Sequence, residues 1–80
     1  MHYVYLLESL ADRDRRYVGV TTDLKQRIRD HNAGKSTHTA KYQPWRLVAY
    51  VAFSDKSKAV AFERYIKSGS GHAFARRRLW

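Results

Sequence analysis

The sequence predicts an α/β (α+β) domain, a small three-stranded antiparallel sheet flanked by helices, with its elements in the order β-β-α-β-α-α. Three observations lead to this fold class. Short runs of aromatic and branched residues are typical of strands, and apolar residues at helical spacing behind capping residues are typical of helices. No linker is long enough to divide 80 residues into two units, so we expect one domain over residues 1–80.

The first two strands are expected at Tyr3–Leu7 and Tyr17–Thr21, because both segments are rich in aromatic and branched side chains. The charged stretch Ala11–Arg16 separates them and has no apolar periodicity. Two such runs around a short polar connection predict a β-hairpin.

The first helix should run from Leu24 to Asn32. Asp23 can cap its first turn, and Leu24 and Ile28 form an apolar stripe. Gly34 stands where a left-handed residue commonly ends a helix. The polar and basic stretch that follows, residues 35–43, should be an exposed loop.

The third strand is expected at Trp45–Phe53, just after Pro44. It is apolar enough to be covered on both faces, which predicts a central strand that carries the core. Ser54 or Asp55 can cap a second helix, which should end near the turn Ser68–Gly71. A short basic helix, residues 72–79, should close the chain.

The charge balance points to a polyanionic partner. Sixteen Lys and Arg residues against seven Asp and Glu residues give a net charge of +9 on 80 residues. Such an excess favours nucleic acid, although small basic domains also include ribosomal proteins and proteins that are merely soluble.

Composition also excludes several classes of protein. The absence of cysteine rules out disulfide scaffolds, thiolate nucleophiles and zinc fingers. No apolar run approaches the roughly 18 residues that a membrane span needs, and the N-terminus does not resemble a secretory signal. We expect a soluble cytoplasmic protein with no membrane partner, nucleoid-associated if its source is bacterial.

Glu63 differs from the other six carboxylates, which fall in a charged turn, at helix caps or on solvated faces. At about 100° per residue it points roughly 60° from the centre of the stripe formed by Ala59, Phe62 and Ile66. A carboxylate at such a boundary is costly without a partner. The alternatives to a functional role are an ion pair with Lys67 or a side chain that reaches past the stripe to solvent.

Arg27 and His31 lie four residues apart on one side of the first helix and border its apolar stripe. They would direct a guanidinium and an imidazole towards the sheet edge. Tyr3 and Tyr5 share one strand face by alternation, and Tyr17 stands on the neighbouring strand. A solvated basic flank, a charge effect at the helix C-terminus and ordinary core tyrosines are the simpler alternatives.

Together these positions resemble the GIY-YIG endonuclease superfamily. Tyr3-Val4-Tyr5 and Tyr17-Val18-Gly19 stand for its two tripeptides, followed by the pair Arg27-x-x-x-His31 and the helix Ala59-x-x-x-Glu63-x-x-x-Lys67. The likeness spans nearly the whole chain and is strongest to the short stand-alone members. Tyr3 replaces the first glycine, and Ala75 lies near the place of an asparagine that many relatives carry.

The resemblance implies a catalytic site in which Arg27 faces the scissile phosphate and Glu63 is the sole protein carboxylate on Mg²⁺ or Mn²⁺. It suggests Tyr5 as the base for the attacking water, Tyr17 as a ligand of phosphate or water, and His31 as an aid to proton transfer. A phenol of pKa about 10 must then be made more acidic to act at neutral pH.

The activity implied is a metal-dependent endonuclease that hydrolyses phosphodiester bonds in DNA rather than RNA, compatible with structure-selective cleavage in DNA repair or recombination. A protein partner or a homodimer would supply substrate recognition. The expected contacts to the nucleic-acid backbone, each of which could also be solvated charge, are Lys35, His38, Thr39, Lys41, Lys67, Arg76, Arg77 and Arg78.

Two other functions compete with cleavage. A nucleic-acid-binding module on the same scaffold would bind in a salt-sensitive manner without needing a metal or Glu63. An interaction protein using exposed Trp45, Trp80 and the basic tail would leave Arg27, His31 and Glu63 unexplained. Metalloprotease, hydrolase-triad and phosphate-loop motifs are absent.

Overall fold

The computed structural model describes residues 1–80 and confirms the fold class. The elements are β1 (His2–Ser9), β2 (Arg16–Thr21), α1 (Leu24–Asn32), a 3₁₀ helix (Ala40–Tyr42), β3 (Trp45–Phe53), α2 (Lys56–Lys67) and α3 (Gly69–Arg78). The order differs from the expected one only by the 3₁₀ helix, which interrupts the predicted loop. None of the helices combines the length and the apolar character needed to cross a bilayer.

The sheet has the strand order β2-β1-β3, and both pairings are antiparallel. The prediction that Trp45–Phe53 is the central strand was therefore wrong, because β1 lies between the other two. Four successive residues of β1, Val4 to Leu7, are buried, whereas the edge strand β3 exposes Arg46, Tyr50 and Ala52. An apolar run does not say which strands will be its neighbours.

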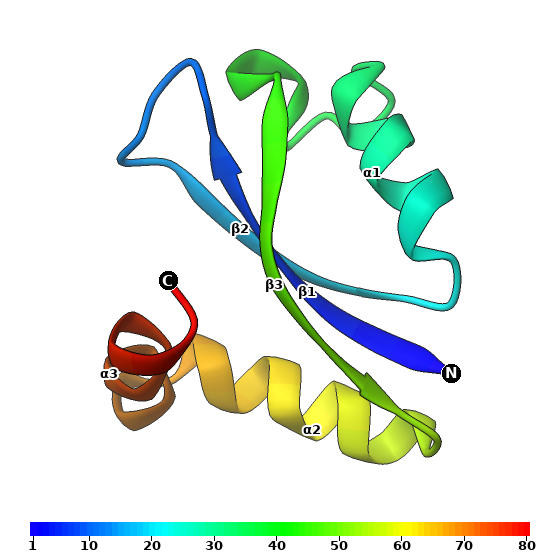
Figure 1. Ribbon diagram of the computed structural model, residues 1–80, viewed down its shortest axis with the longest axis vertical. Coiled ribbons are helices and arrows are strands. Elements are labelled where there is room, and N and C mark those ends of the chain that lie inside the picture. Colours follow the sequence, from blue (N-terminus) through cyan, green and yellow to red (C-terminus); the bar gives the residue numbers. More distant parts are fainter.

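The helices cover both faces of this sheet, with α1 on one side and α2 and α3 on the other (Figure 1). Tyr5, Leu7 and Trp45 form the buried cluster beneath α1, against which Leu24 and Ile28 pack. Because side chains alternate along a strand, Val4 and Leu6 face the opposite side, towards α2. The core thus consists of two thin layers on either side of β1.

Side chains cap the helices at their N-termini. Asp23 accepts a hydrogen bond from the backbone N–H of Gln26, and Asp55 accepts one from that of Ser57. The last helix begins at Gly69 and not at residue 72, because the Ser68 hydroxyl accepts from the N–H of Gly71 and so starts a new helical turn. The predicted Ser68–Gly71 turn is thus mostly part of α3.

Gly71 also sets how closely α3 approaches α2. A Cβ added at Gly71 would lie 1.6 Å from the carbonyl oxygen of Tyr65 in the last turn of α2. Only a residue without a side chain allows this contact. The two helices therefore form one unit behind the sheet, with Ala75 fully buried.

Candidate active site

Four of the predicted catalytic residues meet on the α1 side of the sheet. The ring of Tyr17 lies 4.9 Å from the His31 ring and 6.2 Å from the Tyr5 ring, measured between centroids. The Arg27 guanidinium lies beside the hydroxyls of both tyrosines. Two strand phenols, a helical imidazole and a helical guanidinium thus share one location.

Gly19 makes room for this arrangement. It pairs directly with Tyr5 across the β1–β2 ladder, and a Cβ added at Gly19 would lie 2.5 Å from the Tyr5 hydroxyl oxygen. The Tyr5 ring can therefore lie across β2 only because position 19 has no side chain. The glycine of the second tripeptide thus provides space for the Tyr5 ring, a role that the motif alone does not reveal.

A chain of buried hydrogen bonds holds Tyr5 and His31 in place. The Tyr5 hydroxyl is 2.9 Å from His31 Nε2, and His31 Nδ1 is 2.6 Å from the Thr39 hydroxyl. The Thr39 carbonyl accepts a 2.8 Å hydrogen bond from the Trp45 indole N–H. A neutral imidazole can accept at one nitrogen and donate from the other, which satisfies both of its neighbours.

This chain corrects two predictions. Thr39 is only 1 % exposed, so its hydroxyl supports His31 and is not available as a contact to DNA. Trp45 is only 5 % exposed, so it is a core residue and not part of an interaction surface. The burial of both residues depends on packing against α1, through His31 for Thr39 and through Leu24 and Ile28 for Trp45, and the local sequence pattern does not show that packing.

Burial raises the pKa of Tyr5 to about 12, although the Arg27 guanidinium opposes the shift. The hydroxyl is therefore protonated at neutral pH, and the Tyr5 side chain is 1 % exposed. The structure thus shows the opposite of the acidic phenol that a base at this position requires. Burial, with help from Arg27, lowers the pKa of His31, so its ring is neutral at neutral pH.

Arg27 keeps its charge in this setting. Its interaction with the Tyr5 hydroxyl raises the pKa of the guanidinium above its ordinary value. The residue is half-buried on α1, with the phenols on one side. A cation that lies beside two phenols and forms no ion pair with a carboxylate is suited to bind an incoming anion.

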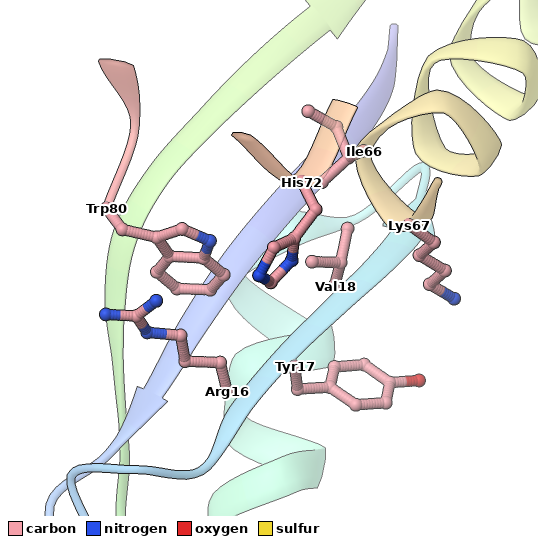
Figure 2. A pocket seen from close by; sticks show the side chains of 7 residues that line it. All are labelled: Arg16, Tyr17, Val18, Ile66, Lys67, His72 and Trp80. Atoms are coloured by element: carbon pink, nitrogen blue, oxygen red, sulfur yellow. The ribbon is translucent and has the colours of Figure 1, made fainter. Parts of the chain in front are cut away.

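Glu63 projects from α2 with a side chain that is 19 % exposed, and it forms an ion pair with Lys67 one helical turn further on. This is one of the structural alternatives given by the sequence. The Lys67 side chain also lines a cavity with Tyr17, shown in Figure 2. The edge strand β2 supplies Tyr17 from the α1 side, and α2 supplies Lys67 from the other. Glu63 thus lies on the opposite face of the sheet from α1 and is linked to the Tyr17 cavity only through its ion pair with Lys67.

No group of three or more His, Cys, Asp or Glu side chains could hold a metal, so a divalent ion at Glu63 would take most of its ligands from water or substrate. Mg²⁺ typically keeps several waters and binds one or two carboxylates together with phosphate oxygens of the substrate. Glu63 fits that requirement as a single ligand. Its ion pair shows that a metal would compete with the Lys67 ammonium for the carboxylate.

The remaining predicted contacts fall into two groups, one in the loop after α1 and one at the end of α3, and these two segments lie apart in Figure 1. His38 and Lys41 are exposed in the loop after α1, Lys35 forms a 3.7 Å ion pair with Asp30, and Lys41 lies 5.7 Å from the Tyr42 ring centroid. Exposed arginines Arg76, Arg77 and Arg78 end α3. Apart from Thr39, these side chains remain accessible to a polyanion.

A hairpin that carries two tyrosines, a helix that carries an arginine and a histidine, and a later helix with a glutamate are the parts of a GIY-YIG nuclease-like module. The GIY-YIG catalytic domain matches residues 1–76 of this sequence. The chain belongs to the GIY-YIG catalytic domain family.

Its relatives include short proteins of similar size. UPF0213 protein HQ_3675A of Haloquadratum walsbyi is 40 % identical over 68 residues, which are 84 % of this chain and 74 % of that protein. The solution NMR structure of UPF0213 protein BH0048 from Bacillus halodurans is similar with a TM-score of 0.57 and 38 % identity, covering 95 % of this chain and 82 % of that one.

A longer relative carries a functional name. A Giardia intestinalis protein named as a homolog of the structure-specific endonuclease subunit SLX1 is 42 % identical over 65 residues. The match covers 76 % of this chain and only 18 % of that protein.

Proposed function

We propose that this protein is a divalent-metal-dependent endonuclease that hydrolyses phosphodiester bonds in DNA. The observation that carries the proposal is the convergence of Tyr5, Tyr17, Arg27 and His31 at one place in a chain of the GIY-YIG family. Such a group can bind a phosphate, stabilise negative charge and handle protons, which are the needs of hydrolysis.

Arg27 is the residue that we assign to the scissile phosphate. Hydrolysis increases the negative charge on the phosphoryl and leaving oxygens, and a guanidinium already held in place stabilises that charge as it develops. The protonated hydroxyl of Tyr5 keeps Arg27 in position and adds no negative charge that would compete with the phosphate.

Tyr17 replaces Tyr5 as our candidate for the base. Tyr5 is buried, is hydrogen-bonded to His31 and has a pKa of about 12, whereas Tyr17 is half-buried and lines an open cavity. The Tyr17 hydroxyl also lies beside Arg27. Tyr5 and His31 then act as positioning residues for Arg27 and Tyr17.

Glu63 is the residue that would hold Mg²⁺ or Mn²⁺. When bound, the ion would supply a Lewis acid for the phosphate and a more acidic water. When no ion is bound, Lys67 neutralises the Glu63 carboxylate. When the carboxylate binds metal, the Lys67 ammonium would be released towards the nucleic acid. This exchange explains how one lysine can serve both as an ion-pair partner and as a phosphate contact.

The net charge of +9 and the exposed cations in the loop after α1 and at the end of α3 support DNA as the substrate. The relative named for a structure-specific endonuclease supports selectivity for DNA structure, in repair or recombination, rather than for a base sequence. A protein partner or a homodimer would add recognition to a module of this size, and the cytoplasm is the compartment that we propose.

The test is cleavage of a panel of duplex, flap, fork and junction DNA with Mg²⁺ or Mn²⁺. We expect nicking or cutting by the purified protein, none in chelator and none by Glu63→Ala. Cleavage that persists in Glu63→Ala would mean a contaminating enzyme or a different metal site.

The ion pair between Glu63 and Lys67 favours one alternative, a module that binds nucleic acid without cutting it. In that case the panel would show tight, salt-sensitive binding by both the wild type and Glu63→Ala, and no cleavage with either metal. Binding is therefore measured alongside cleavage for every substrate.

A further inference from the structure

An open cavity of about 340 Å³ lies at the β2 edge, between β2, the end of α2, α3 and Trp80 beyond the end of α3 (Figure 2). This volume is at the lower end of the roughly 300–1,000 Å³ typical of small-molecule sites. The lining residues are Arg16, Tyr17, Val18, Ile66, Lys67, His72 and Trp80. The catalytic roles proposed above use only Tyr17 and Lys67 of this set.

The chemistry of the lining is aromatic and cationic. Trp80 lies against Arg16, with the guanidinium carbon 4.7 Å from the ring centroid, and His72 stands beside them in the view of Figure 2. Two cations and an imidazole line the cavity, and none of the seven residues is acidic. Planar aromatic and guanidinium groups near cations are the usual means by which proteins bind an exposed nucleobase and its phosphate.

Trp80 is held in this position by the backbone. Its N–H donates a 2.9 Å hydrogen bond to the carbonyl of Ala75, a fully buried residue of α3. The chain therefore turns back after α3 and places the indole beside β2. An aromatic side chain placed by a structured helix end can bind a planar group with little loss of conformational freedom.

The cavity borders the candidate active site on two sides. Tyr17 belongs to both, and Lys67 joins the cavity to Glu63 through its ion pair. In Figure 2 the Tyr17 hydroxyl and the Lys67 ammonium extend to the same side, away from Trp80. A phosphate at the hydroxyl end would therefore have its neighbouring nucleotide at the Trp80 end.

We propose that this cavity binds an unpaired nucleobase of DNA next to the scissile phosphate, stacked on the Trp80–Arg16 pair, with Lys67 near the backbone. A base inside a duplex is stacked between its neighbours and cannot offer its face to the pair, so the substrate must have an unpaired nucleotide at the cut, as flaps and bulges do. This inference rests on the proposed function and deepens it, because it names the feature of the DNA that is recognised.

The experiment measures binding without cleavage, in chelator, by anisotropy with labelled DNA of equal length that is either fully paired or carries one unpaired 2-aminopurine. We expect roughly 10- to 100-fold tighter binding to the unpaired nucleotide and quenching of its fluorescence on stacking. Trp80→Ala should remove both effects, and Trp80→Phe should keep most of them. Phe74→Ala removes an exposed aromatic residue of α3 outside this cavity and should behave as wild type.

Arg16→Ala provides a second variant, at an exposed position, should Trp80→Ala lose its normal circular dichroism spectrum. It should weaken the preference for the unpaired nucleotide. The inference would be overturned if the wild type bound both DNAs with equal affinity. It would also be overturned if the preference and the quenching were unchanged in folded Trp80→Ala or in Arg16→Ala. If cleavage depends on Glu63 but the preference for the unpaired nucleotide is absent, only the proposed role of the cavity is refuted. If the preference is present but no cleavage occurs, the proposed nuclease activity is refuted and the role of the cavity stands.

Discussion

At the scale of single residues, the most informative feature is the contrast between two tyrosines on neighbouring strands. Both belong to the tripeptides that reveal the family, yet Tyr5 is buried under α1 with a raised pKa and Tyr17 lies at an open edge. Gly19 contributes to the difference, since it leaves room for the Tyr5 ring against β2. Similar motif residues therefore receive different chemical roles.

Arg27→Ala should lower kcat by ~100-fold or more, because it removes a charge that we assign to the transition state. The fold should persist, since the guanidinium contributes little to the core. The measurement is steady-state cleavage together with circular dichroism. Arg29→Ala is the matched control, an exposed arginine two positions along α1 that should retain wild-type kcat. Normal turnover by folded Arg27→Ala would contradict the assignment.

His31 should make stability depend on pH on the acid side. Its pKa is lowered in the folded protein, so below the ordinary value of about 6.5 the unfolded chain binds more protons than the folded one. The free energy of unfolding should therefore be fully present above about pH 6.5 and fall as the pH drops towards the lowered pKa. Urea denaturation between neutral and mildly acidic pH measures this slope.

His31→Gln should flatten that slope, whereas His38→Gln, at an exposed loop position, should leave it unchanged. A slope that survives in folded His31→Gln would assign the effect to another group.

At the scale of elements, the pair α2 and α3 shows how one small residue joins two helices. Gly71→Ala would place a Cβ 1.6 Å from the Tyr65 carbonyl oxygen, and the backbone there cannot move without separating the helices. We expect a loss of about 1–3 kcal/mol or more, as is typical of overpacking. Denaturant unfolding measures it.

Gly69→Ala is the control for this prediction, because nothing lies within 4 Å of an added Cβ at that position. It should leave stability unchanged or raise it by up to about 1 kcal/mol. Equal effects of the two substitutions would show that the close helix contact does not matter.

At the scale of the whole molecule, the exposed cations of the loop after α1 and of the end of α3 should bind phosphates of one nucleic acid. Each phosphate contact that is lost should reduce the slope of log affinity against log salt by about 1. The triple change of Arg76, Arg77 and Arg78 to Gln should therefore weaken binding and reduce the slope by up to about 3.

The control for this prediction is the double change of Lys56 and Lys58 to Gln, two exposed cations in the first turn of α2. It lowers the net charge without touching the predicted contacts. A similar loss of slope in both variants would mean that only overall charge attracts the DNA.

The sequence by itself determined the local structure and the family. The spans Leu24–Asn32 and Trp45–Phe53 were predicted with the bounds that the structure has, Asp23 and Asp55 are caps, and Gly34 has φ +74°. These features depend on residues only a few positions apart, so caps, periodicity and turn residues are sufficient to predict them.

Only the tertiary structure decided the strand order, the burial of Thr39 and Trp45, the raised pKa of Tyr5 and the partnership of Arg16 with Trp80. Burial and pKa depend on which distant segments pack over a side chain, and a local pattern does not contain that information. The positions of Tyr17 and Lys67 around the β2 edge follow from the same packing, and they place the cavity next to the candidate active site.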